Sequence, residues 1–99
     1  MNLLETVRQF LNITWEDEAL DNQLNSYINS SKDFLNKVAG VDELDFESAG
    51  LPQDLLLNRV LYMNSHNLND FGTNYICELN RLRIEYAVLD EQSNSWKII

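Results

Sequence analysis

One run of side chains constrains the fold of this chain more than any other feature of its sequence. Between residues 15 and 39, apolar or small residues recur at steps of three and four, which is the spacing of one face of an α-helix. The members of this face are Leu20, Leu24, Ile28, Ser31, Leu35 and Val38. Thr14 is the expected N-cap, and Gly40 supplies a left-handed residue to end the helix. We therefore predict one long helix over residues 15–39 and an all-α fold organised around it.

Three further segments have helical spacing, so the sequence predicts a small bundle of about four helices. A short first helix is expected over residues 3–11 and a third over residues 51–67. The third segment is apolar on nearly every side, so it is expected either to be central or to be covered by a second chain. A turn is expected over residues 67–72, followed by a fourth helix over residues 74–90 that is capped by Thr73.

The predicted fourth helix carries two apolar lines. The first line consists of Tyr75, Leu79, Leu82, Tyr86 and Leu89 and suits the core. The second line, Ile76, Ile84 and Val88, lies off that stripe. A domain of 99 residues has little room to bury both lines, so the second line is the candidate subunit interface.

The chain is strongly acidic, and the acids are concentrated in its first half. It has 16 Asp and Glu against 7 Lys and Arg, a formal net charge of −9. Residues 16–54 contain ten acids and only two bases. Residues 41–50 lack helical spacing and are expected to form an acidic loop, with a short strand near residues 44–46 as one option. The acids of this loop are Asp42, Glu43, Asp45 and Glu47. Such a charge argues against a protein that grips nucleic acid phosphates.

The last residues of the chain form a separate feature. We expect a helical domain over residues 1–91 and an extended docking tail over residues 92–99. The tail ends in Trp96, Lys97, Ile98 and Ile99. Because chain ends usually fray, these large apolar residues either fold back on their own domain or dock on another protein.

Nothing in the sequence indicates catalysis, a cofactor or a metal site. His66 and Cys77 are the single histidine and the single cysteine, too few for a zinc site. We interpret His66 as a residue of a helix end, Cys77 as a small apolar residue and Trp15 as an anchor in the core or at a helix start. No apolar run approaches the roughly 18 residues of a membrane span, and no signal peptide is visible. A cytoplasmic place of synthesis and assembly is therefore expected.

The order of these features resembles the head–tail connector, or adaptor, family of tailed bacteriophages. The segments that carry the resemblance are FLNI at 10–13, the acids at 16–18, the helix end at 34–40, the LP pair at 51–52 and the Asn-rich turn at 62–67. The sequence ELNRLRIEY in the predicted fourth helix resembles the siphophage branch of the family.

The resemblance implies a structural virion protein and not an enzyme. Family members form a ring, commonly of twelve identical subunits, under the portal protein. The ring extends the DNA channel and carries the next neck or stopper protein. By this resemblance, the tail would dock on the portal and DNA would pass without specific binding. The four loop acids are the candidate channel-facing residues, because like charge would prevent DNA from sticking. The alternative is that the acids keep the subunit soluble and monomeric before it meets the portal. The expected location is the neck of the virion, after assembly in the cytoplasm of the host bacterium.

A different class of protein remains as an alternative. A small acidic regulator or inhibitor could imitate DNA and occupy the basic cleft of a partner. It would need carboxylates spaced like phosphates on a continuous face. The long helix offers Asp17, Asp21 and Asp33, but asparagines interrupt that row.

Overall fold

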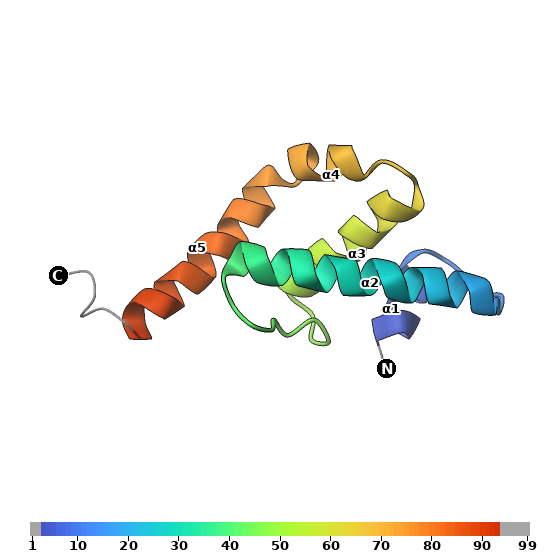
Figure 1. The fold of residues 1–99 in the computed structure, drawn as a ribbon, viewed down its shortest axis with the longest axis horizontal. Helices are drawn as coiled ribbons and strands as arrows, with labels where there is room; N and C mark the ends of the chain where they lie inside the picture. Colours follow the sequence, from blue (N-terminus) through green and yellow to red (C-terminus); the bar gives the residue numbers. More distant parts are fainter. Residues whose placement is uncertain (1–2, 94–99) are drawn as a thin grey trace.

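The chain folds into five α-helices that are arranged around one long helix (Figure 1). The computed structural model describes residues 3–93 and, of these, the side chains of residues 3–86. The helices are α1 (Leu3–Phe10), α2 (Glu18–Ala39), α3 (Leu51–Asn64), α4 (Leu68–Asn74) and α5 (Ile76–Ser93). Residues 3–93 contain no β-strand, so the predicted all-α class is confirmed.

The apolar face of α2 packs into the core as predicted. Leu24, Ile28, Ser31 and Leu35 are buried, and Leu20 and Val38 at the two ends of the face are half-buried. Full burial of one leucine side chain contributes about 2 kcal/mol, so this face is a main source of stability. It joins α2 to α1, α3 and α5.

The helix α2 begins three residues later than predicted, because its N-cap is Asp17 and not Thr14. The Asp17 carboxylate accepts hydrogen bonds from the backbone N–H groups of Ala19 and Leu20, at 3.0 and 3.2 Å. A carboxylate is a better cap than a threonine hydroxyl, and it gains from the positive end of the helix dipole. The prediction of Thr14 as the cap was wrong for this reason.

Three of the helices end at a residue with left-handed backbone. These residues are Asn12, Gly40 and His66, with φ angles of 61°, 74° and 59°. After each one, the next backbone N–H donates to the carbonyl oxygen five residues earlier: Ile13 to Arg8, Val41 to Asn36 and Asn67 to Tyr62. This pattern is the Schellman motif, which satisfies the last carbonyl groups of a helix. His66 therefore has a structural part, since it ends α3.

The helix α3 lies at the centre of the molecule, where it contacts the other four helices. Its buried side chains include Leu55, Leu56 and Val60. The sequence left two explanations for its apolar circumference, a central position or cover by a second chain. The central position of α3 explains why this helix is apolar on nearly every side.

Residues 68–74 form the helix α4, where the sequence predicted a turn, and the bundle therefore has five helices in place of about four. This helix forms because one of its side chains packs against α3. Phe71 is buried, and its ring lies 5.8 Å from the Tyr62 ring and 5.0 Å from the Tyr75 ring. Burial of this aromatic anchor outweighs the poor helix propensity of its Asn, Asp and Gly neighbours.

The chain bends at Tyr75, between α4 and α5, and both helices arch over one side of α2 and α3 (Figure 1). Thr73 lies inside α4, so it does not cap the last helix as predicted. The Tyr75 hydroxyl donates to Asn58 Oδ1 at 2.9 Å, and this bond ties the bend to α3.

Candidate functional site

The acidic loop, residues 41–50, keeps its four predicted carboxylates in solvent. The chain alternates between buried and exposed residues here, with Leu44 and Phe46 in the core. Asp42, Glu43, Asp45 and Glu47 are all exposed. The optional strand at residues 44–46 does not form, since the alternation comes from two apolar anchors in an irregular loop.

Hydrogen bonds to the flanking helices fix the shape of this loop. The Leu44 backbone N–H donates to Asn36 Oδ1 on α2 at 2.9 Å. From α3, Gln53 Nε2 donates to the carbonyl oxygens of Phe46 and Glu47, at 3.0 and 3.4 Å. The loop is therefore built to present acids in a set arrangement.

Asp45 differs from its neighbours because it also shapes the loop. Its carboxylate accepts hydrogen bonds from the backbone N–H groups of Glu47 and Ser48, at 3.1 and 3.2 Å. The side-chain and backbone hydrogen bonds from Ser48, followed by the bond from Glu47, lower the pKa of Asp45. Asp45 therefore stays charged to a lower pH than an ordinary aspartate does.

The outward side of α5 carries the candidate subunit interface. We define the α5 face as the exposed residues Ile76, Cys77, Asn80, Arg81, Arg83 and Ile84. Ile76 is 51% exposed and Ile84 is 61% exposed, although both are fully apolar. The opposite side of α5 buries Leu79 and Leu82, as the first apolar line predicted. The side chain of Val88 lies outside the described residues, and the interface role of this line stays a prediction.

A second exposed apolar surface lies at the N-terminal end of α2. We define the N-terminal corner as Phe10, Trp15, Glu16, Asp17 and Glu18, all of which are exposed. Trp15 is 57% exposed, so of its two interpretations, an anchor in the core or at a helix start, the first was wrong. The Arg8 guanidinium donates to the Trp15 carbonyl oxygen and lies 3.7 Å from an Asp21 carboxylate oxygen. The backbone at Trp15 is thereby held to α1 while the indole ring stays in solvent.

The buried side of the molecule contains one cation that sequence reasoning missed. Arg59 is only 8% exposed, and its Nη1 donates to Ser31 Oγ at 3.0 Å and to Ser30 Oγ at 3.3 Å. The guanidinium carbon lies 4.6 Å from the centre of the Phe34 ring. No carboxylate pairs with Arg59 among residues 3–86, and burial lowers its pKa. Ser31, a polar residue in the apolar face of α2, was the feature of the sequence that could have indicated a buried polar partner such as Arg59.

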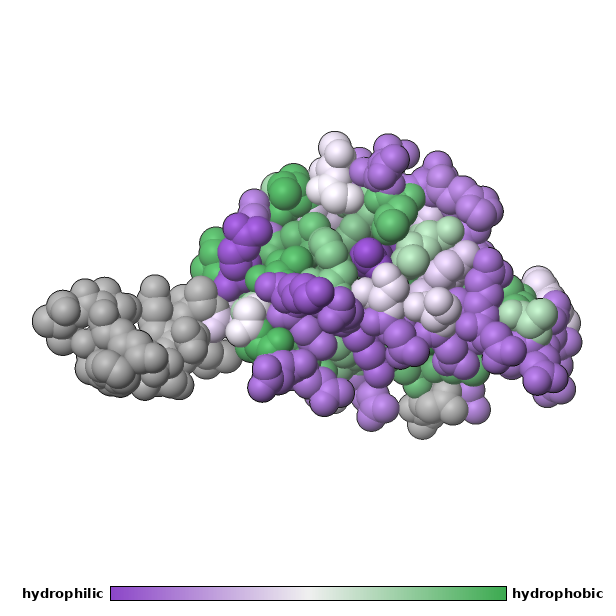
Figure 2. All heavy atoms as spheres, in the orientation of Figure 1, coloured by the Kyte–Doolittle hydropathy of each residue, from purple (hydrophilic) through white to green (hydrophobic). Residues whose placement is uncertain are grey.

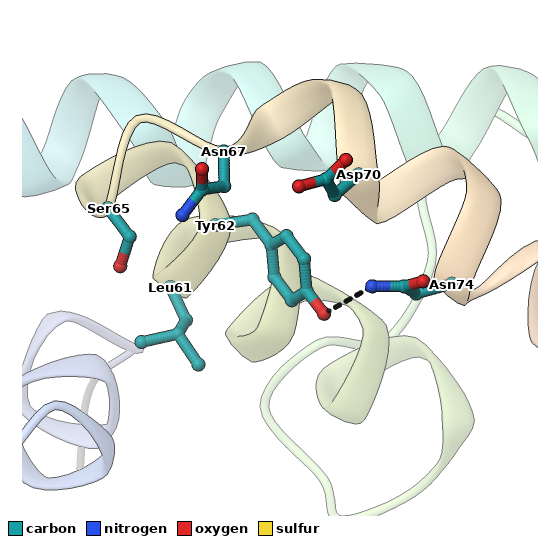
Figure 3. A pocket seen from close by; sticks show the side chains of 6 residues that line it. All are labelled: Leu61, Tyr62, Ser65, Asn67, Asp70 and Asn74. Carbon is teal, nitrogen blue, oxygen red and sulfur yellow. Dashed lines mark hydrogen bonds between the residues drawn. The ribbon is translucent and has the colours of Figure 1, made fainter.

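A hollow of about 390 Å³ lies between the end of α3 and α4 (Figure 3). The six residues that line it are Leu61, Tyr62, Ser65, Asn67, Asp70 and Asn74. Asn74 Nδ2 donates to the Tyr62 hydroxyl at 3.0 Å, which joins the two walls. Asp70 is the single charged residue of this lining, so the hollow offers no metal-ligand set.

The two residues considered for nucleophilic chemistry lie on different elements. His66 follows the last turn of α3, and Cys77 is exposed in the first turn of α5. Within the described residues, no group of three or more His, Cys, Asp or Glu side chains is placed to hold a metal ion. None of the helices in residues 3–93 has the length and apolar character needed to cross a bilayer.

The predicted docking tail falls outside the described residues. These are Trp96, Lys97, Ile98 and Ile99. The helix α5 extends to Ser93. The division into a domain of residues 1–91 and a tail of residues 92–99 stays a prediction.

An acidic, all-helical domain whose distinctive features are exposed surfaces has the makeup of an assembly protein. A family model described as phage connector protein matches residues 3–70. This match spans well over half of the chain, so the protein belongs to the phage connector family. The family is structural and not enzymatic, and membership makes the chain a component of the virion that interacts with other virion proteins. Comparisons with curated proteins and with solved structures gave no match.

The acids on which the DNA-mimic alternative depended all have partners in their own chain. Asp17 caps α2, Asp21 pairs with Arg8, and Asp33 lies 3.0 Å from the Lys37 ammonium nitrogen. Two of the three charges are therefore partly neutralised by a neighbouring cation. The row is a poor imitation of a phosphate backbone, and the family match favours the connector.

Proposed function

We propose that this protein is the head–tail connector of a siphophage-type virion, where identical copies form a ring beneath the portal protein. The observation that carries the proposal is the family match over residues 3–70. In this account the ring lengthens the DNA channel and provides the surface to which the next neck or stopper protein attaches. Twelve copies is the expected number, and assembly takes place in the host bacterial cytoplasm.

The acidic loop supports a lining role in this ring. The backbone that carries its four exposed carboxylates is held by hydrogen bonds with side chains of α2 and α3, so the charge stays in one region of each subunit. Around a channel, repeated acids would repel the phosphates of passing DNA and prevent them from sticking. The same acids also oppose self-association of free subunits before they reach the portal.

Charge reversal in the loop tests the lining role. Asp42 and Glu43 are the best positions, because Asp45 shapes the loop and Glu47 donates to it through its backbone. In heads that carry Asp42→Lys with Glu43→Lys, we expect DNA ejection to slow while rings still form. The control is Asp33→Lys with Asp70→Lys, which makes the same change in net charge on α2 and α4. Equal ejection rates for the two variants and the wild type would leave the loop with a solubility role only.

Deletion of residues 96–99 tests the predicted attachment through the tail. The described core is formed among residues 3–82, so we expect an unchanged helical circular dichroism spectrum after the deletion. Binding to portal-bearing capsids is expected to be lost, as measured by cosedimentation. A full-length control with Lys97→Ala keeps the three apolar side chains and should bind. If the deletion variant binds capsids as well as the wild type does, the tail does not attach the protein to the portal.

A further inference from the structure

We propose that neighbouring subunits join through two different surfaces, with the α5 face of one copy against the N-terminal corner of the next. This inference rests on the proposed ring and adds which side chains make its subunit contacts. The occupant of the α5 face is thus a second copy of the same chain.

The α5 face combines apolar and positively charged side chains. An α-helix turns by about 100° per residue, so Cys77, Asn80, Arg81 and Ile84 point away from the buried Leu79 and Leu82. Ile76 and Arg83 flank the buried side and are also exposed. Arg81 and Arg83 are exposed on this face, beside Ile76 and Ile84. Arg81 lies 3.4 Å from Glu85 in a solvent-exposed pair, which holds it only weakly. Both arginines are therefore available to a partner that carries acids.

The N-terminal corner has the complementary composition. Phe10 and Trp15 supply large exposed apolar side chains, and the three consecutive acids Glu16, Asp17 and Glu18 follow directly. Exposed aromatic residues are typical of the centre of protein interfaces, and opposite charges around them favour one partner and one orientation. The left-handed Asn12 and the Arg8 contact to Trp15 fix the backbone of this corner.

The two surfaces lie in different parts of the molecule. In Figure 1, α5 passes the C-terminal end of α2, and the segment that leads into α2 lies at the other end of that helix. Figure 2 shows hydrophobic surface gathered over the side of α4 and α5, and a smaller hydrophobic patch at the end of the molecule where α2 begins. A contact between two different surfaces repeats from copy to copy and closes into a ring when the rotation fits. A two-fold contact of α5 with α5 would instead bring two positively charged faces together, and like charges oppose it.

Cysteine crosslinking tests the contact, with the natural Cys77 as a reporter on the α5 face. A disulfide needs Cβ atoms about 4 Å apart, so it forms only across a close contact. On portal-bearing heads under mild oxidation, Thr14→Cys, directly beside Trp15 of the N-terminal corner, should give a ladder of covalent oligomers up to the full ring. The control Asn29→Cys, on the exposed side of α2, and the wild type should give none. Disulfide-linked dimers in the wild type would show an α5 to α5 contact and overturn the proposal.

Charge exchange gives a second test that does not depend on crosslinking. Arg81→Glu with Arg83→Glu makes both surfaces acidic, and Glu16→Lys with Glu18→Lys makes both basic. Each variant alone should form rings on the order of tenfold less often per head than the wild type. An equimolar mixture of the two should recover rings, and so should one chain with all four changes. Circular dichroism and thermal unfolding of each variant verify that it folds.

The outcomes separate this inference from the proposed function. Rings of wild-type protein on portal-bearing heads support the proposed function by themselves. If those rings form and the charge variants assemble like the wild type, the inference fails while the proposed function stands. The inference also fails if the variant Arg81→Glu with Arg83→Glu no longer binds heads and the chain with all four substitutions does not recover binding. The α5 face would then contact the portal or the stopper protein and not a second copy. If the wild-type protein forms no rings, both the inference and the proposed function are contradicted.

Discussion

At the scale of single residues, His66 shows how one side chain can be explained without chemistry. It follows α3 with a φ angle of 59°, and its backbone N–H donates to the Met63 carbonyl oxygen at 3.1 Å. Histidine and asparagine enter this left-handed region more readily than most residues, whereas β-branched residues clash there. The sequence predicted a histidine at a helix end, and the structure confirms that position.

Substitution of His66 tests this explanation. We expect His66→Val to lower the free energy of unfolding by about 1 kcal/mol or more, because valine is strained in left-handed backbone. His66→Asn is the matched control and should stay within about 0.5 kcal/mol of the wild type. Urea unfolding followed by circular dichroism measures both. If the valine and asparagine variants are equally stable, the histidine is not held by its backbone conformation.

Asp45 shows a residue effect that depends on pH. Its pKa is lowered by hydrogen bonds from Ser48 and Glu47, so its stabilising contribution is present above the pKa of the unfolded chain. That contribution is lost as the pH falls through the lower pKa of the folded state. In Ser48→Ala, which removes the strongest of these bonds, we expect the pKa of Asp45 to move back toward its ordinary value. A carboxyl NMR titration measures this shift, with Asp42 as the internal reference. An unchanged Asp45 pKa would contradict the assigned cause.

At the scale of elements, the sequence predicted what depends on neighbours along the chain. The face of α2 and the burial of Leu79 and Leu82 on α5 follow from spacing of three and four, and the stop at Gly40 follows from its left-handed backbone. The helix α4 was missed because it depends on the packing of Phe71 against Tyr62, which is a tertiary contact. Arg59 was missed for the same reason, since its hydroxyl partners lie on another helix. Trp15 was misjudged because an indole exposed at a surface looks the same in sequence as one in the core.

The start of α2 provides a test at this scale. Asp17→Ala removes the carboxylate that accepts from Ala19 and Leu20, and it should lower the free energy of unfolding by about 1 kcal/mol. Thr14→Ala should change it by less than about 0.5 kcal/mol, because Thr14 is exposed and lies outside the cap. Thermal and urea unfolding distinguish the two. A larger effect at Thr14 than at Asp17 would restore the boundary that the sequence predicted.

At the scale of the whole molecule, the fold leaves three features on its outside. These features are the acidic loop, the α5 face and the N-terminal corner. A ring subunit needs a surface for each neighbour and a surface toward the channel. The sequence predicted the acidic loop and the apolar line of α5, whereas the exposed corner emerged only from the packing of α1 against α2.

Electron microscopy of portal-bearing heads incubated with the purified wild-type protein tests the central claim most directly. The account predicts a closed ring of identical copies, coaxial with the portal and open along the axis of the DNA channel. Heads without density below the portal, or single copies scattered over the capsid, would contradict it.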